Sequence, residues 1–113
     1  MHELSLCQNM LEIVEQQCKS HDIKKVTDLW LEIGALSCVE PDALEFCFDI
    51  TFQGTAAEGC KLHLIPIAAQ AWCWQCQKLV EIQAHHDSCP NCGSIHLQQQ
   101  SGDELRIKEI AFE

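Results

Sequence analysis

Residues 73–76 read Cys-Trp-Gln-Cys and residues 89–93 read Cys-Pro-Asn-Cys-Gly, with twelve residues between the two cysteine pairs. Each Cys-x-x-Cys pair can present two thiolates on one tight turn, and two such turns facing each other form a tetrahedral cage of four sulfurs. This cage suits Zn²⁺, with iron as its main competitor. Gly93 permits a left-handed turn that lets backbone N–H groups point at sulfur. The predicted metal ligands are Cys73, Cys76, Cys89 and Cys92.

Two helices and three strands are predicted outside this motif. Apolar residues recur at steps of three and four over residues 3–19, which predicts a helix with one buried stripe. Residues 26–33 alternate between apolar and polar, which predicts a strand. A second helix is expected to begin at Pro41, because the missing N–H of proline needs no partner in a first helical turn. Further strands are predicted at residues 61–68 and 104–112.

This order of elements predicts an α+β fold. Two helices pack against a three-stranded sheet, and a zinc-ribbon-like module is inserted between two strands of that sheet. The predicted domains are an α/β domain of residues 1–68 plus 101–113 and a zinc-binding domain of residues 69–100. Pro66 favours an edge position or a bulge for its strand, since proline cannot donate to the ladder, and an exposed edge would allow a homodimer to form. The alternation in the last strand slips by one, which predicts a bulge near Lys108.

The charge of the chain limits its partners. Seven basic and seventeen acidic residues among 113 give a net charge of −10, which repels phosphate backbones and makes nucleic acid a poor candidate partner.

No apolar run approaches the roughly 20 residues that a membrane span needs, and the first residues lack the basic start of a signal peptide. Nine cysteines cannot all pair with one another. We therefore expect a cytoplasmic protein whose thiols are free or bound to metal.

The amino terminus carries a second metal-binding pattern. The α-amino group, the amide nitrogen of His2 and its ring nitrogen can close fused five- and six-membered chelate rings, and the amide of Glu3 can supply a fourth nitrogen in the same plane. Square-planar nitrogen coordination is what Ni²⁺ and Cu²⁺ prefer. The Glu3 carboxylate can add an axial contact. The same residues also fit an ordinary chain end in front of the first helix.

Three stretches of the chain together resemble one known family. They are the opening Met-His-Glu-Leu-Ser-Leu-Cys-Gln at residues 1–8, the segment Val-Thr-Asp-Leu-Trp-Leu-Glu-Ile-Gly-Ala-Leu-Ser-Cys-Val-Glu at residues 26–40, and the paired-cysteine insert that begins at Trp72. In this order they closely resemble the HypA/HybF family of nickel metallochaperones for [NiFe]-hydrogenase maturation, and the second and third stretches are more similar to its HybF branch. The resemblance covers essentially the whole chain.

The resemblance implies two metals with different roles. Nickel as cargo would be bound at Met1, His2 and Glu3, while the four cysteines would hold structural zinc. It also implies two partners, the GTPase HypB and the precursor of the hydrogenase large subunit. The sequence contains no Ser-His-Asp set, paired carboxylates or phosphate loop, so we expect a protein that is not an enzyme and that depends on its partner for GTP hydrolysis.

The residues alone leave other functions open. A rubredoxin-like electron carrier would hold iron in the same cage, and a zinc-ribbon interaction module would use zinc alone. A thiol oxidoreductase is disfavoured, because two facing pairs favour ligation and neither lies in a βαβ context. His85, His86 and His96 flank the cysteines, and each can replace a cysteine as zinc ligand, although solvent exposure is the simpler interpretation.

Three cysteines outside the motif and two tryptophans beside it are expected to have packing roles. Cys7, Cys18 and Cys47 lie on the apolar stripes of the predicted helices, where a free cysteine behaves as a small hydrophobe. Trp72 and Trp74 bracket the first cysteine of the cage and are expected to shield the thiolates.

Overall fold

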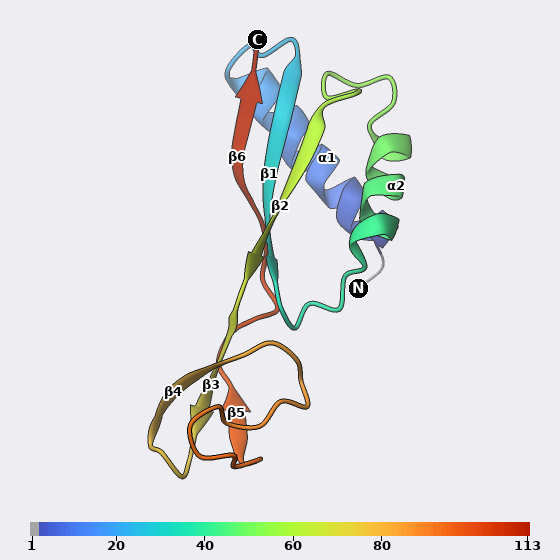
Figure 1. Ribbon diagram of the computed structural model, residues 1–113. Coiled ribbons are helices and arrows are strands. Elements are labelled where there is room, and N and C mark those ends of the chain that lie inside the picture. The colour runs from blue at the N-terminus through green and yellow to red at the C-terminus, as the bar shows by residue number, and fades with distance from the viewer. Residues whose placement is uncertain (1–2) are drawn as a thin grey trace. The chain divides into compact units, whose positions relative to one another are not determined.

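The computed structural model of the protein describes residues 3–113, and its helices and strands are shown in Figure 1. The elements in chain order are α1 (Glu3–Ser20), β1 (Val26–Gly34), α2 (Pro41–Thr51), β2 (Lys61–Ile67), β3 (Ala69–Cys73), β4 (Lys78–Ile82), β5 (Leu97–Gln99) and β6 (Leu105–Phe112). The predicted α+β class is confirmed, with both helices and all three expected strands in place. Among the described residues, no helix combines the length and the apolar character that crossing a membrane requires.

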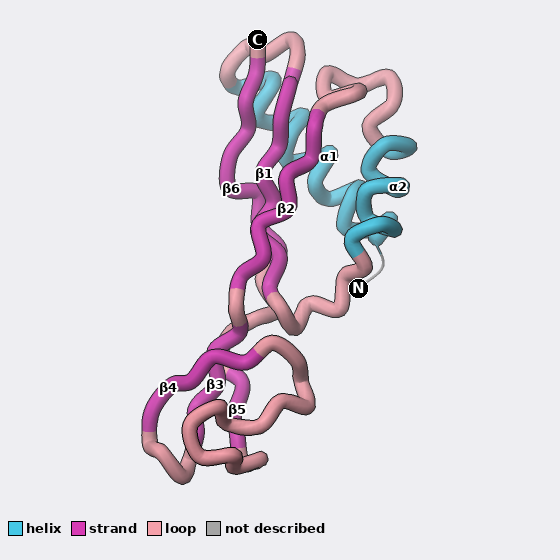
Figure 2. The backbone as a smooth tube through the Cα atoms, viewed as in Figure 1, coloured by secondary structure: helices cyan, strands magenta, loops and turns pink. Residues whose placement is uncertain are grey.

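The strands form two sheets of three strands each (Figure 2). The first sheet has the order β2-β1-β6, so β2, which contains Pro66, is an edge strand. This confirms the edge position predicted from the proline. The second sheet has the order β4-β3-β5, and the sequence did not predict it.

The described chain divides into two compact units. Of the described residues, the first unit contains 3–31, Val39–Leu64 and Ile107–Glu113, and the second contains Glu32–Cys38 and Ile65–Arg106. The domains predicted from the sequence, residues 1–68 plus 101–113 and residues 69–100, stay a prediction.

In the first unit, the two helices pack against each other and bury their apolar stripes. Leu6, Met10 and Val14 of α1 are buried, as are Leu44 and Phe48 of α2. Because these side chains recur at helical spacing, one face of each helix enters the core, while Phe46 and Ile50 of α2 remain exposed. Burial of this stripe stabilises α1, since most helical stability in proteins comes from packing of an amphipathic face.

The start of α2 is set by its capping residues. The Glu40 carboxylate accepts a hydrogen bond from the backbone N–H of Ala43 at 2.7 Å, and Pro41 occupies the first helical turn as predicted. At the other end of the helix, the ring of Phe52 stacks on Phe48 with ring centroids 4.2 Å apart. Both rings are buried, so the C-terminal end of α2 is anchored in the core.

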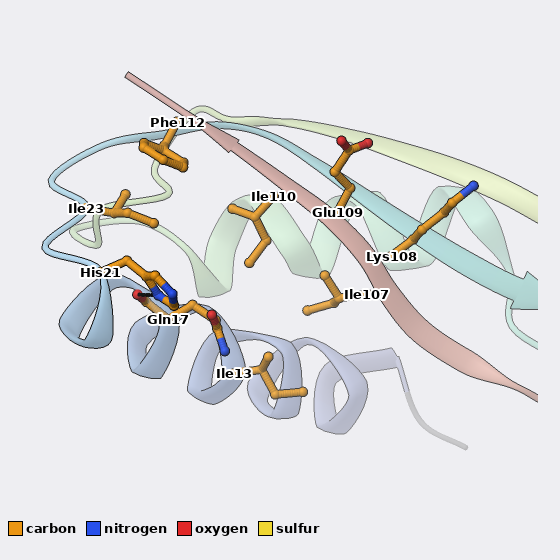
Figure 3. A pocket seen from close by; sticks show the side chains of 9 residues that line it. All are labelled: Ile13, Gln17, His21, Ile23, Ile107, Lys108, Glu109, Ile110 and Phe112. Carbon is orange, nitrogen blue, oxygen red and sulfur yellow. Dashed lines mark hydrogen bonds between the residues drawn. The ribbon is translucent and has the colours of Figure 1, made fainter.

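A groove of about 360 Å³ lies between α1 and the edge strand β6 (Figure 3). Figure 3 shows Ile107 and Ile110 pointing toward the helix, while Lys108 and Glu109 between them both point away. In a regular strand, residues three apart would lie on opposite faces. The predicted slip in the alternation is therefore real, and the bulge proposed to cause it stays a prediction.

In the second unit, β3 pairs antiparallel with both β4 and β5. Its odd-numbered residues Ala69, Ala71 and Cys73 are fully buried, whereas Gln70 is exposed and Trp72 is half-buried. This alternation places the first cysteine of the metal motif at the buried end of the central strand. The rest of the motif is built around that position.

Candidate metal centre

The four motif cysteines converge on one point of the second unit. One ligand atom from each of them lies within 4.8 Å of the others. The Sγ atoms of Cys73 and Cys92 are 3.6 Å apart, and those of Cys76 and Cys89 are 3.9 Å apart. A tetrahedral cage with Zn–S bonds of about 2.3 Å has sulfurs about 3.8 Å from one another. The donor set and its spacing therefore fit Zn²⁺.

Two turns of matching geometry present these sulfurs. In the first turn, the N–H of Gln77 donates to the carbonyl oxygen of Cys73 at 2.7 Å, and in the second the N–H of Gly93 donates to that of Cys89 at 2.9 Å. The last residue of each turn is left-handed, with φ of 54° at Gln77 and 78° at Gly93. The role predicted for Gly93 is confirmed. The corresponding position of the first turn is occupied by Gln77. Because this residue is not a glycine, the sequence did not indicate its left-handed conformation.

Backbone N–H groups prepare one of the thiols for metal. The N–H groups of Cys92 and Asn91 stabilise the thiolate of Cys89 and lower its pKa to about 6. The N–H of Asn91 lies 3.4 Å from this sulfur. Hydrogen bonding with Cys92, together with burial, instead raises the pKa of Cys76 to about 12. A divalent cation in the cage would favour the thiolate at all four positions, so its binding must displace the Cys76 proton.

The cage is buried on one side and open on the other. Cys73 and Cys89 are buried, packing with Val80 and with the half-buried Leu97, whereas Cys92 is exposed. The apolar cluster beside the cage is small, since it consists of Cys73, Val80 and Cys89 with the half-buried Cys76 and Leu97 packed against them. A metal ion is therefore the main link between its two turns.

Comparison with known proteins decides the family. Residues 1–112 match the family described as "Hydrogenase/urease nickel incorporation, metallochaperone, hypA". The chain belongs to the HypA family. Over the full length of both proteins, it is 62% identical to hydrogenase maturation factor HypA of Actinobacillus succinogenes and 53% identical to hydrogenase maturation factor HybF of Salmonella typhimurium.

Solved structures show the same HypA fold. The solution structure of the Ni metallochaperone HypA from Helicobacter pylori matches with a TM-score of 0.69 and 18% sequence identity, covering 99% of this chain and 97% of that chain. A second match, titled a solution structure of HypA protein, has a TM-score of 0.71 at 18% identity and covers 100% and 97%. At such identity the agreement concerns the fold alone.

The resemblance seen in the sequence is thus confirmed, and with it the function of the HypA/HybF family, nickel metallochaperones in hydrogenase maturation. This function replaces the rubredoxin-like and zinc-ribbon alternatives. Nickel as cargo follows from the family, and the four-cysteine cage fits structural zinc. A metallochaperone family is not a class of enzymes. Relatives named HypA and relatives named HybF both match this chain over their whole length. The HybF-like stretches therefore do not show to which of the two branches the chain belongs.

The flanking histidines do not join the zinc cage of this HypA-family chain. Among residues 3–113, the four cysteines are the only group of three or more histidine, cysteine or acidic side chains placed to hold a metal together, and no histidine belongs to it. His85 instead donates from Nε2 to the carbonyl oxygen of Leu36 at 3.2 Å. His86 and His96 are exposed, in agreement with the simpler interpretation of the sequence.

The expected shielding role of the tryptophans is wrong for Trp74. This side chain is 61% exposed, and its ring meets that of Trp72 edge to face with centroids 6.2 Å apart. Trp72 lies on the outward face of β3, between Leu79 of β4 and Gln98 of β5. Neighbouring residues of a strand face opposite sides, so Trp72 points away from the face of β3 that carries Cys73.

The residues expected to bind nickel are only partly described. Met1 and His2 lie outside the described residues, so that part of the expectation is untested. Glu3 is the first residue of α1 and is half-buried. Four residues later, Cys7 is fully buried and its Sγ lies 3.6 Å from the carbonyl oxygen of Leu44, which confirms its packing role.

Proposed function

We propose that the chain binds Ni²⁺ through Met1, His2 and Glu3 and delivers it to the precursor of the large subunit of [NiFe]-hydrogenase. In this proposal, Zn²⁺ bound by Cys73, Cys76, Cys89 and Cys92 is structural. The observation that carries it is the completeness of the cage. Four sulfurs from the chain fill a tetrahedral coordination sphere and leave no open position for a cargo ion, so nickel needs ligands elsewhere.

The amino terminus offers ligands of the right kind. The amine, the backbone amides and the His2 imidazole supply nitrogen donors in one plane, which Ni²⁺ accepts readily and Zn²⁺ does not favour. Glu3 begins α1, so the helix holds one end of the chelate. Because the donors must lose protons, nickel binding weakens at acid pH, which favours release.

The proposed partners follow from the same role. The GTPase HypB would supply the GTP hydrolysis for which this sequence has no phosphate loop, and the hydrogenase precursor would receive the ion. The strongly acidic chain, with its net charge of −10, is suited to basic protein surfaces. We place this exchange in the cytoplasm, where thiols of such a cysteine-rich chain stay reduced.

His2→Ala tests the nickel site. Untagged protein and the variant are compared by equilibrium nickel titration, with His21→Ala, which removes an exposed histidine at the end of α1, as the matched control. We expect His2→Ala to lose nickel binding at the terminus while its zinc content and far-ultraviolet circular dichroism stay unchanged. An unaltered nickel affinity in this variant would overturn the assignment.

X-ray absorption separates the two metals by their ligands. At the nickel edge we expect nitrogen and oxygen donors in a planar arrangement, and at the zinc edge four sulfurs. Four sulfurs around nickel in zinc-replete protein would mean that the cage, and not the terminus, binds the cargo.

A further inference from the structure

One backbone carbonyl oxygen in the second unit accepts hydrogen bonds from two side chains, a thiol and an imidazole. The carbonyl oxygen of Leu36 lies 3.7 Å from the Sγ of Cys38 and 3.2 Å from the Nε2 of His85. The imidazole comes from a loop 49 residues further along the chain than Leu36. A thiol, an imidazole and a carbonyl oxygen thus meet outside the four-cysteine cage.

The oxygen at the centre is held firmly. The N–H of Leu36 donates to the carbonyl oxygen of Gly102 at 2.6 Å, and its side chain is buried against Ala69 and Ile82. The next N–H along the chain, that of Ser37, donates to the carbonyl oxygen of Gly34 at 3.1 Å. A ligand that used the Leu36 carbonyl group would therefore meet an atom already fixed in place.

Cys38 is held in an unfavourable backbone conformation. Its φ of 61° is left-handed, which costs a residue with a Cβ roughly 1–2 kcal/mol. Such strain persists only where the surrounding structure imposes it, and it is concentrated at functional sites. Outside the zinc cage, Cys38 is also the one exposed cysteine among residues 3–113. The strained turn thus presents an accessible thiol beside the Leu36 oxygen.

The loop that carries His85 is built around Asp87. The Oδ2 of Asp87 accepts hydrogen bonds from the N–H groups of Gln83 at 2.8 Å and Ala84 at 3.1 Å. The N–H of Asp87 in turn donates to the carbonyl oxygen of Ala84 at 3.1 Å. This closed turn fixes the backbone next to His85, and the imidazole reaches from it to the Leu36 oxygen.

We propose that Cys38, His85 and the carbonyl oxygen of Leu36 form a second, exchangeable site for a borderline divalent cation of the Ni²⁺ and Zn²⁺ class. Thiolate, imidazole and carbonyl oxygen are all accepted by such ions. On binding, the Cys38 thiol releases its proton, and the imidazole nitrogen facing the ion coordinates it in the neutral form with its proton on the other ring nitrogen. Both side chains are exposed, so they can close to the bond lengths of about 2.3 Å for sulfur and about 2.1 Å for nitrogen without unpacking the core.

Three protein donors distinguish this site from the cage. An ion held by them keeps open positions for water or for a donor from another molecule, whereas an ion in the four-sulfur cage has none. Open positions permit ligand exchange, which suits an ion in transit. The site goes beyond the terminal nickel site and does not depend on it.

The test uses zinc-loaded His2→Ala protein, so that the proposed terminal site is removed from the measurement. Ni²⁺ is added in steps, and the thiolate-to-nickel charge-transfer absorption in the near ultraviolet is recorded. We expect this absorption to saturate, and Cys38→Ser or His85→Gln to abolish it or weaken nickel binding about tenfold or more. Cys18→Ser and His86→Gln, which change a half-buried cysteine of α1 and an exposed neighbouring histidine, are the matched controls and should leave it unchanged.

Zinc is counted in every sample, because nickel that enters the cage would also give a thiolate signal. The proposal is overturned by the absence of charge-transfer absorption, by its persistence at undiminished nickel affinity in either Cys38→Ser or His85→Gln, or by its appearance only as zinc leaves the protein. Failure of the terminal nickel site would instead show in Cys38→Ser protein, as nickel binding that the further change His2→Ala leaves unchanged, so the two proposals fail separately.

Discussion

The backbone of Gly34 lies directly against the carbonyl group of Gly102, so closely that a Cβ on Gly34 would overlap the carbonyl oxygen. The N–H of Gly34 donates to the carbonyl oxygen of Glu104 at 2.8 Å, which holds the two segments at this distance. This contact joins the end of β1 to the segment that leads into β6, and the N–H of Leu36 donates to the same carbonyl oxygen of Gly102.

We therefore expect Gly34→Ala to lower the free energy of unfolding of the zinc-loaded protein by about 2–3 kcal/mol, since only the backbone can move to relieve the overlap. Gly59→Ala is the control, because Gly59 has a φ of +74° but open space around its Cβ position. This substitution should lower the free energy of unfolding by about 1 kcal/mol, from the unfavourable backbone conformation alone. Urea denaturation measures both. A smaller loss for Gly34→Ala than for Gly59→Ala would contradict the steric argument.

A second prediction concerns Asp28, which fixes a histidine on the first sheet. The Oδ2 of Asp28 lies 2.7 Å from the Nε2 of His63, and the ring of His63 stacks on Trp30 with centroids 4.8 Å apart and planes 16° from parallel. Hydrogen bonds from His63 and from Thr27 lower the pKa of Asp28. Its folded pKa is thus below its unfolded value, so its contribution to stability is present above about pH 4 and is lost as the pH falls through the folded pKa.

Asp28→Asn should accordingly lower the melting temperature at neutral pH, and the difference from the unmodified protein should shrink as the pH falls below about 4. Thermal unfolding followed across this pH range gives the comparison, with Asp49→Asn on the exposed side of α2 as the control. A difference that does not change with pH would show that the carboxylate charge is not the cause.

Removal of zinc is predicted to affect the two units differently. The second unit should lose its order, because the two cysteine turns are joined mainly through the metal, while α1 and α2 keep a core that contains no cage residue. A strong chelator should change the fluorescence of Trp72 and Trp74 but leave most of the helical circular dichroism in place. Cys89→Ser should reproduce this state, and Cys47→Ser should not. Loss of the helical signal on chelation would contradict the prediction.

The same site should bind zinc more tightly as the pH rises. Cys89, with its pKa lowered to about 6, is already a thiolate at neutral pH, whereas Cys76, with its pKa raised to about 12, must give up a proton to the solvent. Competition titrations against a chelator between about pH 6 and pH 8 test this sign. An affinity that falls over this range, after correction for the chelator, would rule it out.

The sequence predicted the long elements and missed the short ones for a physical reason. Helix α1 and strand β1 repeat their apolar pattern often enough to define a period, whereas β5 has three residues and no period at all. The left-handed turn at Gly93 was predictable because glycine indicates it, but Gln77 adopts the same turn under constraints from the fold. The meeting of Cys38 and His85 had no local signal, because only the folded second unit brings these distant segments to one oxygen.

Cysteine reactivity gives a last prediction, in which exposure and pKa act in the same direction. Burial raises the pKa of Cys7 to about 11 and that of Cys60 to about 11, so both thiols are protonated as well as inaccessible at neutral pH. Cys38 is exposed and lies outside the zinc cage. Iodoacetamide added to zinc-loaded protein should therefore modify Cys38 first and Cys7 and Cys60 last, as followed by peptide mass spectrometry. In concentrated guanidinium chloride with a chelator, the rates should become similar. Labelling of Cys7 as fast as Cys38 in the native protein would mean that the α1–α2 core opens far more readily than its packing indicates.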